Sequence, residues 1–112
     1  MPKQSAPLIR VFQALADPTR LAVVERLRDG PVATTELAAP FKMALPSFLQ
    51  HLDVLRACGL ITSSKRGRVR TYELSPEPLK AAEDWMATQR TLWQRRLDQL
   101  DNFLNELKEQ SE

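Results

Sequence analysis

Four basic side chains cluster around one glycine in the second half of the chain. They are Lys65, Arg66, Arg68 and Arg70, on either side of Gly67. Such a cluster can bind phosphate groups, and an arginine at the tip of a turn can enter the minor groove of duplex DNA. The alternative is that these charges only keep the exposed edge of a hairpin soluble. Phosphate contact is favoured because a predicted helix pair directly precedes the cluster.

A second group of candidate residues lies upstream, on a predicted helix. Gln50 is the best candidate for reading a base, because a glutamine amide can form two hydrogen bonds with adenine in the major groove. The alternative is a solvated surface glutamine. Ser47 can contact a base or a phosphate, and Leu49 can pack on a thymine methyl group or be buried at an edge of the domain. His51 is interpreted as a packed or phosphate-bonding residue.

The charge of the chain is unevenly distributed. The formal net charge is only +2. Between Lys42 and Tyr72, however, six basic residues accompany a single acid, whereas five acids and one base lie between Asp98 and Glu112. A phosphate backbone would therefore have a preferred side on which to bind.

Two predicted helices precede this basic region. Apolar residues at i, i+3, i+4 and i+7 indicate one face of a first helix, made of Leu8, Val11, Phe12 and Leu15. Asp17 can cap a second helix, and Pro18 suits its first position. This second helix is expected to close at Gly30 and to turn inward Leu21, Val24 and Leu27.

A helix-turn-helix is expected over about residues 34–58, and a two-stranded hairpin over about 60–74. Thr34 or Thr35 can cap a short helix that Pro40 limits. The next helix begins near Pro46 and runs to about Ala57. Its apolar residues four and three positions apart predict a buried stripe of Phe48, Leu52 and Leu55, with Val54 nearby.

A last helix is expected over about residues 76–109. Spacings of four, three, four and three residues form a heptad seam of Trp93, Leu97, Leu100, Leu104 and Leu107. So long an apolar face predicts a homodimer, whereas the alternative is a helix folded back on its own domain. The residues expected at the dimer interface are Leu8, Val11, Phe12, Trp85, Trp93, Leu97, Leu100 and Leu104.

Several classes of protein are disfavoured by the composition. One cysteine, Cys58, forms no disulfide within the chain, and one histidine with one cysteine does not make a metal site. There is no phosphate loop, activated nucleophile or carboxylate pair, so an enzyme is not expected, nor is a cofactor. No apolar run approaches the length of a membrane span or a leader. We expect one cytoplasmic domain over residues 1–112.

The chain resembles the ArsR-type winged helix-turn-helix transcriptional regulators of prokaryotes. Matching residues run in order through nearly the whole domain: the segment from Ala14 to Arg20 (ALADPTR), Glu36-Leu37-Ala38, His51-Leu52-x-Val54-Leu55, Gly59-Leu60-Ile61, Arg66-Gly67-Arg68 and Tyr72-x-Leu74. The resemblance implies a mainly helical fold with a β wing. It also implies a homodimer formed by the first and last helices, and a recognition helix in the major groove.

The chain departs from the family pattern in the residues expected to contact DNA and in those that bind metal. Lys42 stands where the family often has glycine, so a left-handed or strained turn is expected at this residue. Ala44 stands where the family often has a serine that caps the helix. Leu49 and Gln50 replace a serine and a basic residue, so the DNA sequence read should differ. Many family members bind metal through a Cys-x-Cys on the third helix or His and Asp pairs on the last. This chain resembles a subgroup without those motifs.

The sequence therefore predicts a homodimeric repressor that binds an inverted repeat of double-stranded DNA without metal sensing. Three alternatives stay open. The chain could be a winged-helix module that binds an acidic protein. It could instead be a repressor controlled by a small apolar effector near Trp85 and Trp93, or by oxidation of Cys58.

Overall fold

The computed structural model describes residues 5–111, and side chains from Ala6 onward. Glu112 of the acidic segment therefore lies outside the described residues. By its internal contacts the chain divides between Ala82 and Glu83 into two compact units. The single domain expected over residues 1–112 stays a prediction.

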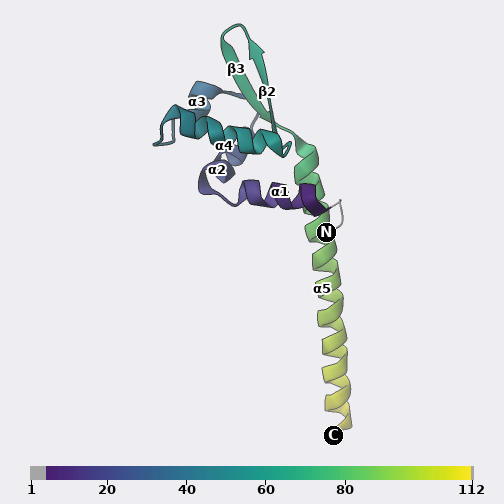
Figure 1. The fold of residues 1–112 in the computed structure, drawn as a ribbon. Helices are drawn as coiled ribbons and strands as arrows, with labels where there is room; N and C mark the ends of the chain where they lie inside the picture. Colours follow the sequence, from purple (N-terminus) through teal and green to yellow (C-terminus); the bar gives the residue numbers. More distant parts are fainter. Residues whose placement is uncertain (1–4, 112) are drawn as a thin grey trace. The chain divides into compact units, whose positions relative to one another are not determined.

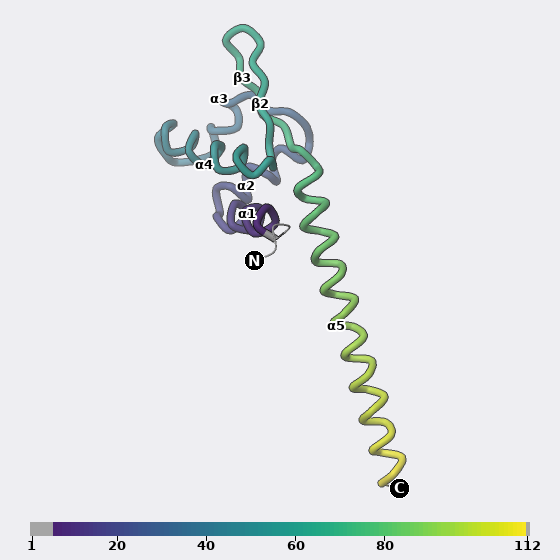
Figure 2. The backbone as a smooth tube through the Cα atoms, turned by 45° about the vertical axis from the view of Figure 1, so that its right-hand side comes forward, coloured from purple at the N-terminus to yellow at the C-terminus, as the bar shows by residue number. Residues whose placement is uncertain are grey.

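The first unit contains four helices, three strands and the start of a fifth helix (Figure 1). The elements, in chain order, are α1 (Ser5–Leu15), α2 (Pro18–Leu27), β1 (Val32–Ala33), α3 (Thr34–Ala38), α4 (Leu45–Ala57), β2 (Ile61–Arg66), β3 (Val69–Leu74) and the beginning of α5 (Pro76–Gln110). Helices α1, α2 and α4 contact one another, and the β2–β3 hairpin extends away from them (Figures 1 and 2). This arrangement is that of a winged helix-turn-helix, as predicted.

The core of the first unit holds the helices and the hairpin together. Its largest fully buried side chains come from α2, α3, α4, β2 and the turn before β2, and they are Val23, Leu27, Leu37, Phe48, Leu52, Leu55, Leu60 and Ile61. Burial of a side chain of this size stabilises the fold by roughly 1.5–3 kcal/mol. The predicted stripe of α4 is confirmed, and the core fixes which face of α4 is turned outward.

The sheet has three strands, one more than the sequence predicted. Its order is β1-β3-β2, with Val32 opposite Tyr72 and Ile61 opposite Leu74. The two residues of β1 are too few to show an alternating pattern, so only the pairing with β3 reveals them. The hairpin turn has Gly67 at its first central position with a φ of 59°, which is the pattern of a type II′ turn.

The helix caps agree with the sequence in some places and differ in others. Asp17 caps α2, accepting a 3.0 Å bond from the Arg20 backbone N–H, and Pro18 begins the helix as predicted. The cap expected from Thr34 or Thr35 is wrong, because Ala33 occupies the N-cap of α3. The left-handed turn expected at Lys42 is also wrong, since only glycines have a positive φ among the described residues.

Two burial expectations were wrong. Leu21 was expected to face inward but is 44% exposed, and the fully buried residue of that turn is Val23. Val54 was expected near the buried stripe of α4 but is 42% exposed. Helix α2 is apolar on more than one side at this point, so periodicity alone could not choose between Leu21 and Val23.

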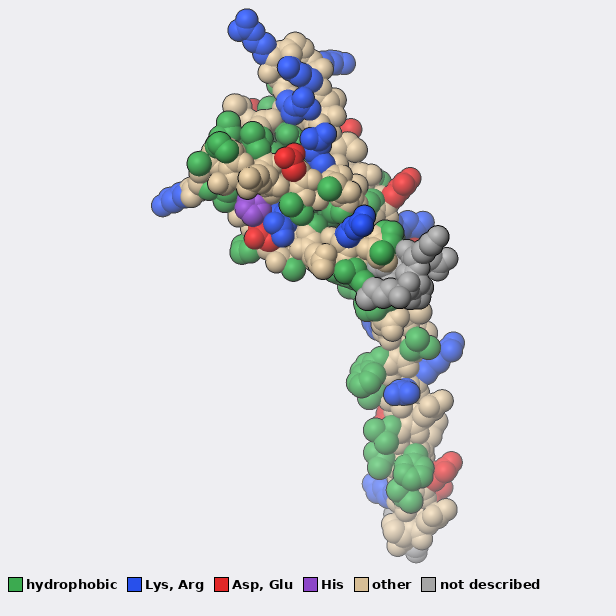
Figure 3. All heavy atoms as spheres, viewed as in Figure 1, with side chains coloured by type: hydrophobic (Ala, Val, Ile, Leu, Met, Phe, Trp, Pro, Cys, Tyr) green, Lys and Arg blue, Asp and Glu red, His purple; other side chains and the backbone are tan. Residues whose placement is uncertain are grey.

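The second unit consists of the part of α5 from Glu83 onward. Its large apolar side chains are all substantially exposed, from 40% for Leu97 to 63% for Trp93. Figure 3 shows several apolar side chains along this helix. Although α5 is 35 residues long, neither it nor any other described helix is apolar enough over a sufficient length to cross a bilayer.

Candidate nucleic-acid interface

The outward face of α4 presents a short polar stripe. Phe48, Leu52 and Leu55 are buried, which turns Ser47 and Gln50 outward on the opposite side, where both are exposed. Leu49 is half-buried and packs against the core. That burial is what the alternative interpretation of Leu49 expected, as a residue at the edge of the domain. The stripe therefore offers a hydroxyl and an amide to a partner.

The beginning of α4 has no side-chain cap. Its N-cap residue is Ala44, whose side chain forms no hydrogen bond, and Pro46 near the first position has no N–H. The absence of a cap that the sequence predicted at Ala44 is confirmed. An uncapped helix start leaves backbone N–H groups unpaired, and these carry partial positive charge.

The hairpin carries the basic cluster in an exposed position. Lys65, Arg66, Arg68 and Arg70 are all exposed, and blue side chains crowd the hairpin in Figure 3. Lys65 and Arg70 lie opposite each other across the two strands, so like charges are neighbours. Among the described residues, no cation of this cluster forms an ion pair with an acid. The cluster therefore keeps its full positive charge for an external partner.

Side-chain hydrogen bonds steady the root of the hairpin. The Arg70 guanidinium donates a 3.0 Å bond to the Ser63 hydroxyl on the neighbouring strand, so Arg70 lies along the sheet. The Thr34 hydroxyl donates to the Arg70 carbonyl oxygen at 3.0 Å, and the Ser64 and Thr71 hydroxyls share a 3.1 Å bond. The Thr34 bond connects the beginning of α3 to β3, and the other two bonds join β2 to β3 within the hairpin.

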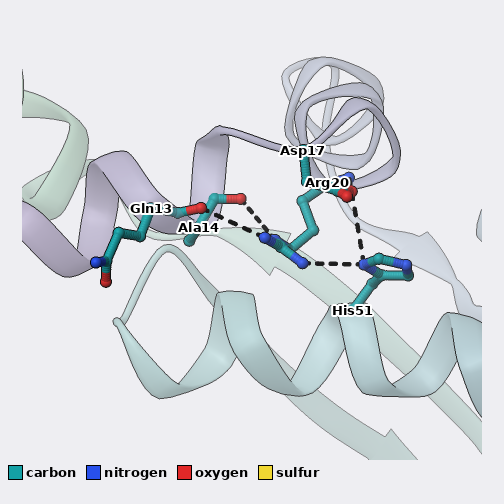
Figure 4. A network of polar contacts seen from close by, with 5 residues as sticks. All are labelled: Gln13, Ala14, Asp17, Arg20 and His51. Carbon is teal, nitrogen blue, oxygen red and sulfur yellow. Dashed lines mark hydrogen bonds and ion pairs between the residues drawn. The ribbon is translucent and has the colours of Figure 1, made fainter.

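A polar network connects α4 to the corner between α1 and α2 (Figure 4). The Arg20 guanidinium donates from Nε to the Ala14 carbonyl at 2.7 Å and from Nη2 to the Gln13 carbonyl at 3.3 Å. Its Nη1 lies 3.2 Å from His51 Nδ1, and Asp17 Oδ2 lies 3.6 Å from the same nitrogen. His51 and Asp17 were singled out from the sequence, but Arg20 was not given a role.

Electrostatics within this network favour ionised Asp17. The pKa of its carboxyl group is lowered from the usual value, chiefly because the carboxylate accepts a hydrogen bond from the Arg20 backbone N–H. The positive charge of Arg20 lowers it further. Asp17 therefore keeps its charge beside the imidazole over the ordinary pH range.

The remaining candidate residues have these positions. Leu8 and Phe12 are half-buried against the core of the first unit, while Val11 is 3% exposed and belongs to that core. Trp85, Trp93, Leu97, Leu100 and Leu104 are exposed on α5. Cys58 is half-buried, and its thiol donates to the Leu55 carbonyl at 3.4 Å. Within residues 5–111 no group of three or more His, Cys, Asp or Glu side chains could hold a metal ion.

Comparison with known proteins identifies the helix-turn-helix of this chain. Residues 15–64 match a helix-turn-helix domain model. The regulator Rv2034 of Mycobacterium tuberculosis is 46% identical over 72 residues, covering 64% of this chain and 67% of that protein. The transcriptional repressor SdpR of Bacillus subtilis is 30% identical over 76 residues, covering 68% and 84%.

A solved structure extends the similarity to nearly the whole fold. The crystal structure of the ArsR family transcriptional regulator RHA00566 is 50% identical with a TM-score of 0.78, covering 84% of this chain and 97% of that one. The similar proteins are regulators and not enzymes. With the exposed polar stripe of α4 and the basic hairpin, these similarities show that the chain is a DNA-binding transcriptional regulator of the ArsR family.

Proposed function

We propose that the chain is a homodimeric repressor that acts in the cytoplasm and binds an inverted-repeat operator in double-stranded DNA. The observation that carries this proposal is the placement of two features in one unit. Helix α4 exposes a polar stripe, and the neighbouring hairpin exposes four cations without acid partners. A helix of this kind fits the major groove, and a basic wing fits the adjacent phosphates.

The proposed roles follow from the chemistry of each side chain. Gln50 reads a base edge in the major groove, with Ser47 beside it on a base or a phosphate. Arg66 and Arg68, at the hairpin tip, contact phosphates or the minor groove. Lys65 and Arg70 supply further phosphate contacts. The wing then contributes much of the affinity, and α4 most of the discrimination between DNA sequences.

The proposed dimer rests on the exposed apolar side chains of α5. A run of leucine and tryptophan side chains left in water is costly and marks an interface. Leu8 and Phe12 of α1, half-buried in the first unit, join the interface, and Val11 supports α1 from the core. Two copies related by a two-fold axis would place two α4 helices in successive major grooves, about 34 Å apart.

DNA binding is tested with the fragment upstream of the protein's own gene. We expect specific binding whose affinity falls steeply with salt, because phosphate contacts release counterions. In the double variant Arg66→Ala/Arg68→Ala the salt slope should decrease by about one for each phosphate that an arginine no longer neutralises. Lys108→Ala removes a cation outside the basic cluster and should leave the slope unchanged. Absence of binding at low salt would contradict the proposal.

We further propose that operator binding does not depend on a metal. The third helix carries Thr34, Thr35 and Glu36 where metal-binding members of the family have cysteines, and His51 is already engaged by Arg20 and Asp17. Soft and borderline metals require several cysteine or histidine ligands at one place. Operator affinity should therefore be the same with micromolar Zn²⁺ and with a chelator, and a change of ten-fold would contradict this.

A further inference from the structure

One ring nitrogen of His51 faces two groups with opposite requirements. His51 Nδ1 lies 3.2 Å from Arg20 Nη1, within hydrogen-bond distance, and 3.6 Å from Asp17 Oδ2, beyond it. A guanidinium has donors and no acceptor, so a hydrogen bond with Arg20 requires Nδ1 to carry a lone pair. The proton of the neutral ring must then be on Nε2, on the side of the ring away from both groups (Figure 4).

Bonds to α1 hold the Arg20 guanidinium in addition to its contact with the imidazole. Its Nε and Nη2 donate to the Ala14 and Gln13 carbonyls near the end of α1. Carbonyls in the last turn of a helix lack partners within the helix, and a cation there is favourable. Two bonds to neighbouring carbonyls restrict the planar guanidinium, and the third direction points to α4. Arg20, which belongs to α2, therefore connects the end of α1 to α4, the helix proposed to contact DNA.

We propose that Arg20 is a positioning residue for DNA binding that acts through His51. It holds the imidazole in the form protonated on Nε2, so that the ring presents an N–H donor outward beside Gln50, and it anchors α4 against the α1–α2 corner. The His51 side chain is 24% exposed, and the proposal places a phosphate oxygen at its outer nitrogen. This inference rests on the proposed function, but its first test does not use DNA.

The chain contains a single histidine, so its ring nitrogens give one pair of NMR signals. In the ¹⁵N-labelled full chain, we expect the neutral wild-type ring to be protonated on Nε2. In Arg20→Met, Nδ1 faces only Asp17, and the proton should move to Nδ1 to donate to that carboxylate. The control Arg26→Met removes an exposed arginine of the same helix and should leave the wild-type form. A wild-type ring protonated on Nδ1, or an unchanged ring in Arg20→Met, would overturn the proposal.

The second test measures operator affinity in a double-mutant cycle. We expect Arg20→Met to weaken binding about ten-fold in the wild-type background and less than two-fold in a His51→Gln background, because Arg20 acts through the ring. Equal losses in both backgrounds would show that Arg20 acts independently and would overturn the positioning role. If the wild type itself does not bind the operator, the proposed function fails, whereas the tautomer measurement still decides whether Arg20 controls His51.

Two isosteric changes keep the test valid if Arg20→Met does not fold. His51→Asn retains an acceptor near the position of Nδ1, and His51→Gln retains a donor near the position of Nε2. Neither change touches the bonds of Arg20 to α1. We expect each to weaken operator binding at least three-fold, because the proposal requires both nitrogens. Wild-type affinity in either variant would contradict it.

Discussion

At the scale of single residues, Asp17 has two separable tasks. Its carboxylate caps α2 through a 3.0 Å bond from the Arg20 backbone N–H, and it lies 3.6 Å from His51 Nδ1. Capping requires only a side-chain oxygen, which asparagine also has. Attraction to a positively charged neighbour requires the negative charge. A change of Asp17 to asparagine therefore removes the charge and keeps the cap.

This separation predicts a difference in acid stability. The lowered pKa of Asp17 means that its charged form stabilises the fold at pH values above its usual pKa of about 3.8, and that this contribution is lost as the pH falls through the lowered value. Asp17→Asn does not titrate, so its urea midpoint should decline less than that of the wild type between about pH 5 and pH 2. Parallel declines of the two proteins would contradict the assignment.

The network around Arg20 also shows a limit of sequence reasoning at this scale. The cap at Asp17 could be predicted because a cap and its helix are adjacent in sequence. Arg20 and His51 are 31 positions apart, and no periodicity connects them. Their contact results from the packing of α1, α2 and α4. The sequence showed a single histidine and an arginine after a capping motif, but neither feature indicates which residue is its partner.

At the scale of elements, the weak point of α4 is its beginning. The N-cap Ala44 has an extended backbone, with φ −64° and ψ 144°, which is the conformation that a capping serine adopts. The backbone is therefore ready for a cap that the side chain does not provide. The helix proposed to contact DNA therefore starts without a side-chain cap, and the buried Phe48 lies near its beginning.

Restoring the cap should stabilise the protein. Ala44→Ser should raise the free energy of unfolding by about 0.5–2 kcal/mol, because the serine hydroxyl can accept a bond from an N–H of the first turn. Thermal or urea unfolding measures this. Ala39→Ser places the same side chain at an exposed position after α3 and should change stability by no more than about 0.5 kcal/mol. Equal effects of both changes would exclude capping as the cause.

Elements were predictable where their signals were local. The i, i+3, i+4 spacing predicted the buried face of α4, and Gly67 predicted the hairpin turn. Strand β1 was missed because a two-residue strand is defined by its partner, here Tyr72 and Thr71 of β3. The outward rotation of Leu21 was missed because its neighbours Ala22, Val23 and Val24 are equally apolar. Contacts between elements decided both cases.

At the scale of the whole molecule, the large apolar side chains of α5 from Leu92 to Leu107 are exposed within their own unit. The heptad spacing could be read from the sequence, and the structure adds that each of these side chains is at least 40% exposed. The sequence could not decide whether another part of the chain covers them. A second copy of the chain is the cover proposed above.

Introducing a charge into this stripe should separate the copies. Leu100→Asp should convert the proposed dimer into a monomer, because an unpaired carboxylate at the centre of an apolar interface is strongly unfavourable. Sedimentation equilibrium gives the mass directly. Asn102→Asp makes the same change of charge about half a helical turn away, on the opposite face of α5, and should remain dimeric. A monomeric wild type would contradict the proposed assembly.

The contacts of Arg20 imply that self-association and DNA binding are linked. Helix α1, proposed to lie at the dimer interface, contributes the Gln13 and Ala14 carbonyls that hold Arg20, and Arg20 in turn contacts His51 of α4. A displacement of the end of α1 relative to α4 would cost free energy in this network. Linkage is reciprocal, so whatever factor dimerisation adds to operator affinity, the operator must add to dimer affinity. The coupling free energy can therefore be obtained by measuring dimer dissociation with and without DNA, as well as by measuring the DNA affinity of monomer and dimer.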